Sequence, residues 1–156
     1  MFSDTDILNL FVVAKTKFSG MENFGLPIFS EAAITFKDGE SSSDDRQRIC
    51  QLVTHEIAQQ WFGDLVTPKW WDEVWLSEGF ATYFEYFTLA EVETAWQMDE
   101  QFVVQQTQVA LQVDSGANTD TLAGKHREIN PLIIPNVKTT VDIERVFDFD
   151  VITSSK

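Results

Sequence analysis

The chain has little positive charge, one cysteine and no long apolar run, and each shortage excludes a class of protein. Lys and Arg total 11 against 25 Asp and Glu, which gives a formal net charge of -14 at pH 7. This balance excludes nucleic acid as a partner, because phosphate binding needs a basic patch. The single cysteine, Cys50, excludes an internal disulfide. No apolar segment approaches the roughly 18–20 residues that a membrane-spanning helix requires.

Aromatic and acidic residues are abundant instead. The 156 residues include 13 Phe and 5 Trp, and 44% of the chain is apolar, which is enough for a packed core. The acidic surface suits a cationic ligand such as the free amino terminus of a peptide, although ordinary solubility explains the charge equally well. No signal peptide pattern follows Met1. Secretion or membrane association would therefore depend on segments outside this chain.

The first 40 residues carry strand signals. The segment ILNLFVVA (7–14) predicts a strand, and IFSEAAITF (28–36) predicts a second, weaker one. Between them, Gly20, Gly25 and Pro27 indicate an edge strand or a loop.

Residues 41–113 are expected to be mostly helical. Ser42 followed by Asp45 forms a capping-box pattern, which predicts a helix that runs to about Phe62 and ends at Gly63. Further helix starts are expected between Trp71 and Ser77, near Thr94 for a helix to about Val113, and after Thr139 or Thr140. With no internal repeat or linker, residues 1–156 are expected to form a single domain.

The segment HEIAQ (55–59) matches the zinc motif H-E-x-x-H except at its last position. Positions four apart share a helix face, so His55 and Gln59 are expected to point the same way. In the full motif two imidazoles hold Zn²⁺, and the glutamate, here Glu56, takes a proton from metal-bound water. Glu78 lies beyond one loop and is the natural third ligand. Taken alone, however, His55 is also compatible with a hydrogen-bonded core histidine.

Two longer blocks, SGMENFGL and HEIAQQWFGDLVTPKWWDEVWLSEGFATYFEY, resemble the gluzincin zinc aminopeptidases of the membrane alanyl and glutamyl type. That family has W-W-x-x-x-W-L-x-E-G-F-A around its last zinc ligand. The matching residues here are Trp70, Trp71, Trp75, Leu76, Glu78, Gly79, Phe80 and Ala81. The resemblance runs from about residue 7 to the last residue and covers only part of the family's catalytic domain.

The resemblance implies an α+β fold, a partial thermolysin-like (gluzincin) catalytic domain. A β-rich part (1–40) would precede the metal-site helices (41–113), and a loop with a final helix start (114–156) would follow. It implies zinc as cofactor, with His55 and Glu78 as ligands and Glu56 as general base. It also implies that Glu22 holds the free α-amine of a peptide substrate, within the substrate-binding segment Ser19, Gly20, Met21, Glu22 and Asn23. A fixed carboxylate selects an ammonium group and thereby favours exopeptidase action.

Three positions depart from the family pattern. Gln59 stands in the second histidine's place and offers a neutral amide instead of an imidazole. Ser154 aligns with a tyrosine whose hydroxyl stabilises the oxyanion, and the loss of one such donor costs roughly 10²–10³ in rate. Ser19 replaces a glycine, a smaller change. Together the three departures favour impaired catalysis.

Three functions stay open: a zinc aminopeptidase with an atypical glutamine ligand, a pseudo-peptidase that binds peptide amino termini without cutting them, and a truncated product without independent function. The family suggests that the protein is located at the extracellular face of the plasma membrane or in the cytoplasm.

We interpret His126 as a surface residue. The aromatic cluster is expected in the core rather than in a substrate pocket: Trp61, Trp70, Trp71, Trp75, Phe80 and Phe84.

Overall fold

A computed structural model describes residues 8–114 and 136–147 of the chain. Its N-terminal part is a three-stranded sheet in the order β1-β3-β2. β3 (Ile28–Ser30) pairs in parallel with β1 (Phe11–Val13) and antiparallel with β2 (Gly20–Met21). The strand predicted over residues 7–14 is shorter than expected, since β1 covers only Phe11–Val13 and residues 8–10 are not strand. Of the two alternatives for the central segment, an edge strand or a loop, the structure has a two-residue edge strand, β2.

The strand predicted over residues 28–36 is wrong beyond Ser30. A short helix, α1 (Glu31–Ile34), follows instead. Glu and Ala are good helix formers and poor strand formers, so this segment turns as soon as the β-branched and aromatic residues end. The Oγ1 of Thr35 donates to the carbonyl of Glu31 at 2.6 Å and closes the turn.

The helix α2 (Ser43–Gln59) begins at the predicted capping box, in which Ser42 and Asp45 bond each other's backbone N–H. A wider π-helical turn, η1 (Gln60–Leu65), continues it and leaves helical geometry at Phe62 and Gly63. The end predicted at Gly63 is therefore close to the observed break. α2 carries the residues of the HEIAQ segment in its last two turns.

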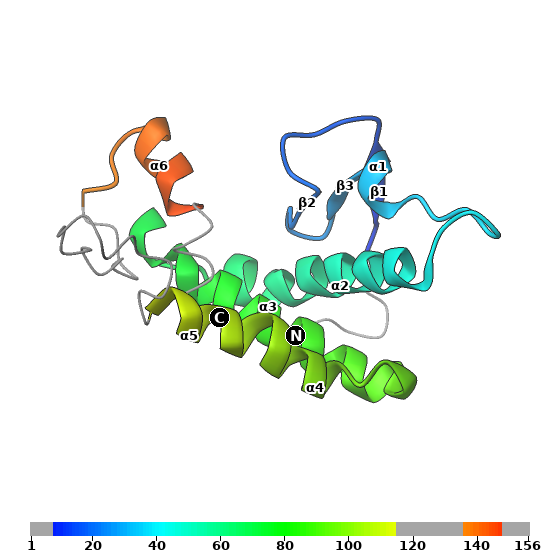
Figure 1. The fold of residues 1–156 in the computed structure, drawn as a ribbon. Coiled ribbons are helices and arrows are strands. Elements are labelled where there is room, and N and C mark those ends of the chain that lie inside the picture. The colour runs from blue at the N-terminus through cyan, green and yellow to red at the C-terminus, as the bar shows by residue number, and fades with distance from the viewer. Residues whose placement is uncertain (1–7, 115–135, 148–156) are drawn as a thin grey trace, which may run out of the picture.

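A short turn, η2 (Trp71–Glu73), leads into the second long helix, α3 (Val74–Val92), which packs along α2. Figure 1 shows the sheet on one side of α2, with α3 and α4 on the other. The sheet thus approaches α2 from the side opposite α4.

The helix predicted from Thr94 to Val113 is interrupted once, near its start. Gln97 adopts a left-handed backbone conformation (φ 52°) and separates η3 (Thr94–Trp96) from the rest. From Met98 onward α4 (Met98–Phe102), η4 (Val103–Thr107) and α5 (Gln108–Asp114) follow one another without a break, as predicted. In the second described range, 136–147, α6 (Thr140–Val146) begins where the sequence predicts a helix. Thr139 and Asp142 cap this helix with reciprocal hydrogen bonds.

The buried core of the helical part is formed by Tyr86, Leu89 and Met98, against which Cys50 packs. The expectation that the Trp and Phe cluster is core is wrong for most of its members. Within the described residues, Trp61, Trp70, Trp71 and Phe80 are each more than a third exposed. Phe62 stacks on both Phe80 and Phe84, with ring centroids 5.0 Å apart in each pair. Phe62, Phe80 and Phe84 therefore pack on one another, with Phe80 at the surface.

None of the helices in the described ranges combines the length and apolarity needed to cross a membrane.

Candidate functional site

A cavity of about 1110 Å³ lies between the sheet, the two long helices and α6, and it brings together most of the predicted site residues. Its lining includes Ser19, Gly20, Met21, Glu22, His55, Glu56, Gln59 and Glu78. Asn23 does not line the cavity. It is exposed, and its amide donates to the carbonyl of Met21 at 3.5 Å. Ser154 and His126 lie outside the described residues.

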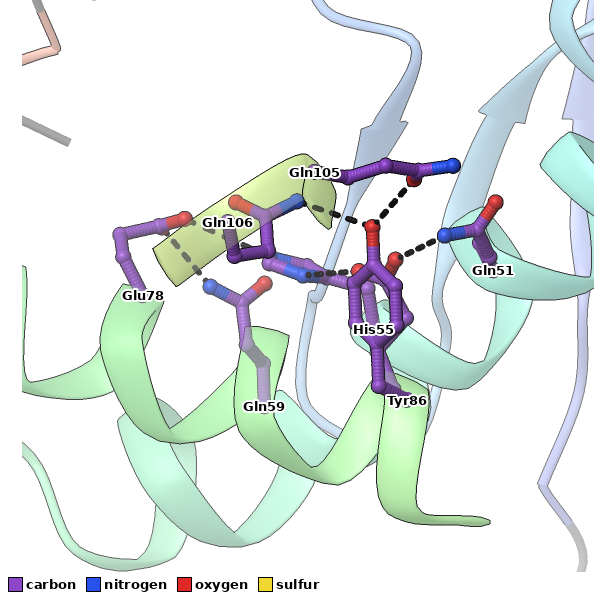
Figure 2. A network of polar contacts seen from close by, with 8 residues as sticks. Gln51, His55, Gln59, Glu78, Tyr86, Gln105 and Gln106 are labelled. Atoms are coloured by element: carbon purple, nitrogen blue, oxygen red, sulfur yellow. Dashed lines mark hydrogen bonds and ion pairs between the residues drawn. The ribbon is translucent and has the colours of Figure 1, made fainter. Parts of the chain in front are cut away.

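The three positions of the predicted metal site meet at one point. Nε2 of His55 lies 3.4 Å from Oε2 of Glu78, and Nε2 of Gln59 donates to Oε1 of the same carboxylate at 2.8 Å. Figure 2 shows these side chains converging from α2 and α3. The expected spacing, one helical turn between residues 55 and 59 and a fold-back to residue 78, therefore produces the expected neighbourhood.

The other ring nitrogen of His55 faces a residue that the sequence analysis missed. Nδ1 lies 3.3 Å from Oε2 of Glu85, and Oε1 of Glu85 accepts a hydrogen bond from Gln51 at 2.9 Å. Burial lowers the pKa of His55, but the hydrogen bonds and charges of Glu78 and Glu85 outweigh it and raise that pKa to about 10. Glu85 follows Glu78 by two helical turns, a spacing that could have identified it.

Glu56 is the most isolated polar group of the site. Its side chain is 5% exposed, and its Oε2 has no hydrogen-bond partner among the described residues. Burial raises the pKa of Glu56 to about 7; the positive charge of His55 opposes this, and the carboxylates of Glu22 and Glu78 add to it. A carboxylate that titrates near neutrality is suited to general acid–base work.

Gly20 brings the backbone of β2 close to Glu56. A Cβ atom on Gly20 would lie 2.7 Å from Cδ of Glu56, closer than side chains pack. Ser19 is exposed, and its carbonyl accepts the N–H of Ser30 at 2.9 Å as part of the sheet. The absence of a side chain at position 20 is therefore what lets β2 rest on Glu56.

Glu22 is held by another residue that the sequence analysis missed. Nε2 of Gln60 donates to the backbone carbonyl of Glu22, and Oε1 of Gln60 accepts the N–H of Gly25 at 2.7 Å. Burial raises the pKa of Glu22, and the nearby carboxylates of Glu78 and Asp64 raise it further. Gln60 directly follows Gln59 in the sequence, so no sequence signal set it apart from an ordinary polar helix residue.

An aromatic wall closes the cavity on the side of α6. Phe147 lies 6.0 Å from Phe18 and 6.3 Å from Trp71, measured between ring centroids. Nζ of Lys17 pairs with Oε1 of Glu144 at 2.6 Å beside these rings. The cavity therefore has an acidic floor and an apolar side wall.

These residues do not fit the zinc that the resemblance implies. A catalytic zinc takes three protein ligands and keeps one position open, whereas the site offers one imidazole, one carboxylate and an amide whose N–H group is turned toward that carboxylate. Across residues 8–114 and 136–147, no group of three or more His, Cys, Asp or Glu side chains is arranged to hold a metal ion.

Comparison with known proteins identifies the same family of peptidases that the sequence motifs indicate. Residues 4–156 match the model of the peptidase family M1 domain. The chain is 38% identical over 128 residues to glutamyl aminopeptidase from Bos taurus, which covers 82% of this chain and 12% of the relative. It is 40% identical over 142 residues to thyrotropin-releasing hormone-degrading ectoenzyme from Mus musculus (91% and 12%) and 34% identical over 141 residues to leucyl aminopeptidase from Saccharolobus solfataricus (90% and 16%). The chain thus spans less than a fifth of the length of these relatives. It belongs to peptidase family M1, with the α+β architecture of a partial gluzincin catalytic domain.

Proposed function

We propose that the cavity binds the free amino terminus of a peptide through Glu22, and that hydrolysis of the peptide is weak or absent. The observation that carries the proposal is the grouping of Glu22 with other carboxylates at the cavity floor. Burial, and to a lesser extent the like charges of Glu78 and Asp64, raise the pKa of Glu22. An ammonium group placed beside it would offset that repulsion and make charge-assisted hydrogen bonds.

The relatives support a peptide as the class of ligand, because several of them are named aminopeptidases. Gln59 supports the loss of catalysis, because it supplies neither an imidazole nor a charge at the second ligand position. Ser154, which the resemblance aligns with the oxyanion tyrosine, adds to the loss because its hydroxyl sits on a short side chain.

The test is a comparison of one peptide with its N-acetylated form by isothermal titration calorimetry. We expect the free peptide to bind at least about 10-fold more tightly, the value of one charge-assisted hydrogen bond. Glu22→Gln should remove this difference. Glu40→Gln, at an exposed carboxylate paired with Lys37 and distant from the cavity lining, should preserve it. Equal affinity for free and blocked peptides would refute the proposal.

A second candidate is an active aminopeptidase with an atypical ligand set, favoured by the position and raised pKa of Glu56. It predicts chelator-sensitive release of amino-terminal residues from aminoacyl anilides. A purified protein without zinc and without turnover would exclude it.

A further inference from the structure

Five side chains form a continuous line of polar contacts across the floor of the cavity. Gln51 donates to Glu85, Glu85 faces one nitrogen of His55, the other nitrogen faces Glu78, and Gln59 donates to Glu78. The four contacts measure 2.9, 3.3, 3.4 and 2.8 Å in that order. Figure 2 shows the labelled members of this line side by side. We refer to Gln51, Glu85, His55, Glu78 and Gln59 as the amide-capped line.

Hydrogen-bond donors and acceptors alternate along the amide-capped line, and no metal ion is needed to complete it. Each carboxylate accepts from an amide at one oxygen and faces an imidazole nitrogen with the other. An amide thus stands at each end and the imidazole in the middle. All five residues are buried or half-buried, so water competes weakly for these bonds.

The amide of Gln59 can have only one orientation in this arrangement. Its nitrogen lies 2.8 Å from a carboxylate oxygen, and an amide oxygen at the same point would repel that carboxylate. Metal ligation by Gln59 would need the opposite orientation, with Oε1 toward the ion, and would also need the carboxylate of Glu78. The bond between Gln59 and Glu78 and the ligation of zinc by Gln59 therefore exclude each other.

We propose that Gln59 replaces the structural role of the zinc ion. Through its bond to Glu78, the amide-capped line holds α2 and α3 in register around a cavity that is complete without zinc. The inference rests on the proposed function, because the cavity it holds is the one that receives the amino terminus. It goes beyond the proposed function because it assigns Gln59 a stabilising hydrogen bond, whereas comparison with the family pattern indicates only that a zinc ligand is lost.

The test uses the purified protein and ZnCl₂ alone as probe, with thermal unfolding and bound zinc as readouts. The unaltered protein should contain no zinc, and neither ZnCl₂ nor EDTA should shift its Tm. Gln59→Leu removes the donor at similar volume and should lower Tm by at least about 2 °C. The matched control is Gln108→Leu, at an exposed glutamine of α5, which should leave Tm unchanged. Gln59→His should bind about one zinc per chain and acquire a Tm that ZnCl₂ raises and EDTA lowers.

If Gln59→Leu does not fold, the same bond is tested in the unaltered protein by NMR. The side-chain amide protons of Gln59 should then exchange with solvent more slowly than those of Gln108. One zinc per unaltered chain with an EDTA-sensitive Tm would overturn the inference. Rapid exchange at Gln59, or a Tm of Gln59→Leu equal to that of the control, would also overturn it.

Failure of this inference can be told from failure of the proposed function. A chelator-sensitive Tm contradicts the amide-capped line even if peptide binding depends on a free amine. Equal binding of free and acetylated peptides contradicts the proposed function even if the protein is indifferent to zinc.

Discussion

Gln60 ties Glu22 to the end of α2 by a hydrogen bond from its side-chain amide to the backbone carbonyl of Glu22. The same amide accepts the N–H of Gly25 through its oxygen, so one side chain clamps both ends of the turn that carries Glu22. Gln60 is fully buried, which means that both bonds are made away from water. The place of Glu22 in the cavity is therefore set by α2 as well as by the sheet.

Replacement of Gln60 by leucine should loosen Glu22. We expect Gln60→Leu to lower the free energy of unfolding by about 1–3 kcal/mol, because two half-buried backbone groups lose their partner. The affinity for a peptide with a free amine should fall about 10-fold. Urea unfolding and calorimetry measure the two effects. Gln108→Leu is the control, and an unchanged affinity in a folded Gln60→Leu would contradict the clamp.

Gly20 should not tolerate even one methyl group. In Gly20→Ala the added Cβ would overlap the carboxylate of Glu56. We expect overpacking to cost about 1–3 kcal/mol of unfolding free energy and to displace Glu56 from the cavity floor. Ser19→Ala, at the exposed neighbour, should change stability by less than about 0.5 kcal/mol. Denaturant unfolding of Gly20→Ala and Ser19→Ala measures this difference. Equal stability of the two variants would mean that β2 is free to move.

The neighbourhood of the site was predictable because helical periodicity places His55 and Gln59 together and the zinc motif calls for a third ligand beyond the loop. The spacing of His55 and Gln59 puts both on one face of α2, and a second helix after the loop returns Glu78 to that face. The capping box at Ser42 likewise fixes where α2 begins. These are local rules, and the sequence contains everything they need.

Apart from Glu85, the partners of these residues were not predictable from the same rules. Gln60 and Gln51 are ordinary polar residues of a helix until the fold shows what they face. The break at Gln97 requires a left-handed conformation that glutamine rarely adopts, so no turn residue marks it. The exposure of Trp70 and Phe80 also depends on packing over the whole chain, whereas composition indicates only that such residues are usually buried.

The buried carboxylate of Glu56 should make stability depend on pH. Because the pKa of Glu56 is raised from 4.5 to about 7, the folded state binds this proton more tightly than the unfolded state does. Its favourable contribution is complete below pH 4.5 and is lost as the pH rises through 7. Glu56→Gln keeps the shape without the charge. The variant should therefore gain stability relative to the unaltered protein as the pH rises from 5 to 8, by on the order of 1–3 kcal/mol.

Urea unfolding of both proteins at pH 5 and pH 8 measures that difference. Glu40→Gln, at an exposed carboxylate, should show the same stability difference at both pH values. If Glu56→Gln behaves like this control, folding does not raise the pKa of Glu56 and its carboxylate is solvated.

Restoration of the family's residues should separate the two proposed causes of weak catalysis. Gln59→His alone restores an imidazole at the second ligand position, and it should bring zinc binding with little turnover. Ser154→Tyr alone should bring neither, because the amide of Gln59 still occupies Glu78. The double variant should release amino-terminal residues from aminoacyl anilides roughly 10²–10³-fold faster than Gln59→His, the usual value of one oxyanion donor.

Rates per bound zinc, determined for all three variants, make this comparison independent of metal loading. A double variant that holds one zinc per chain but is no faster than Gln59→His would show that Ser154 is not the tyrosine's counterpart.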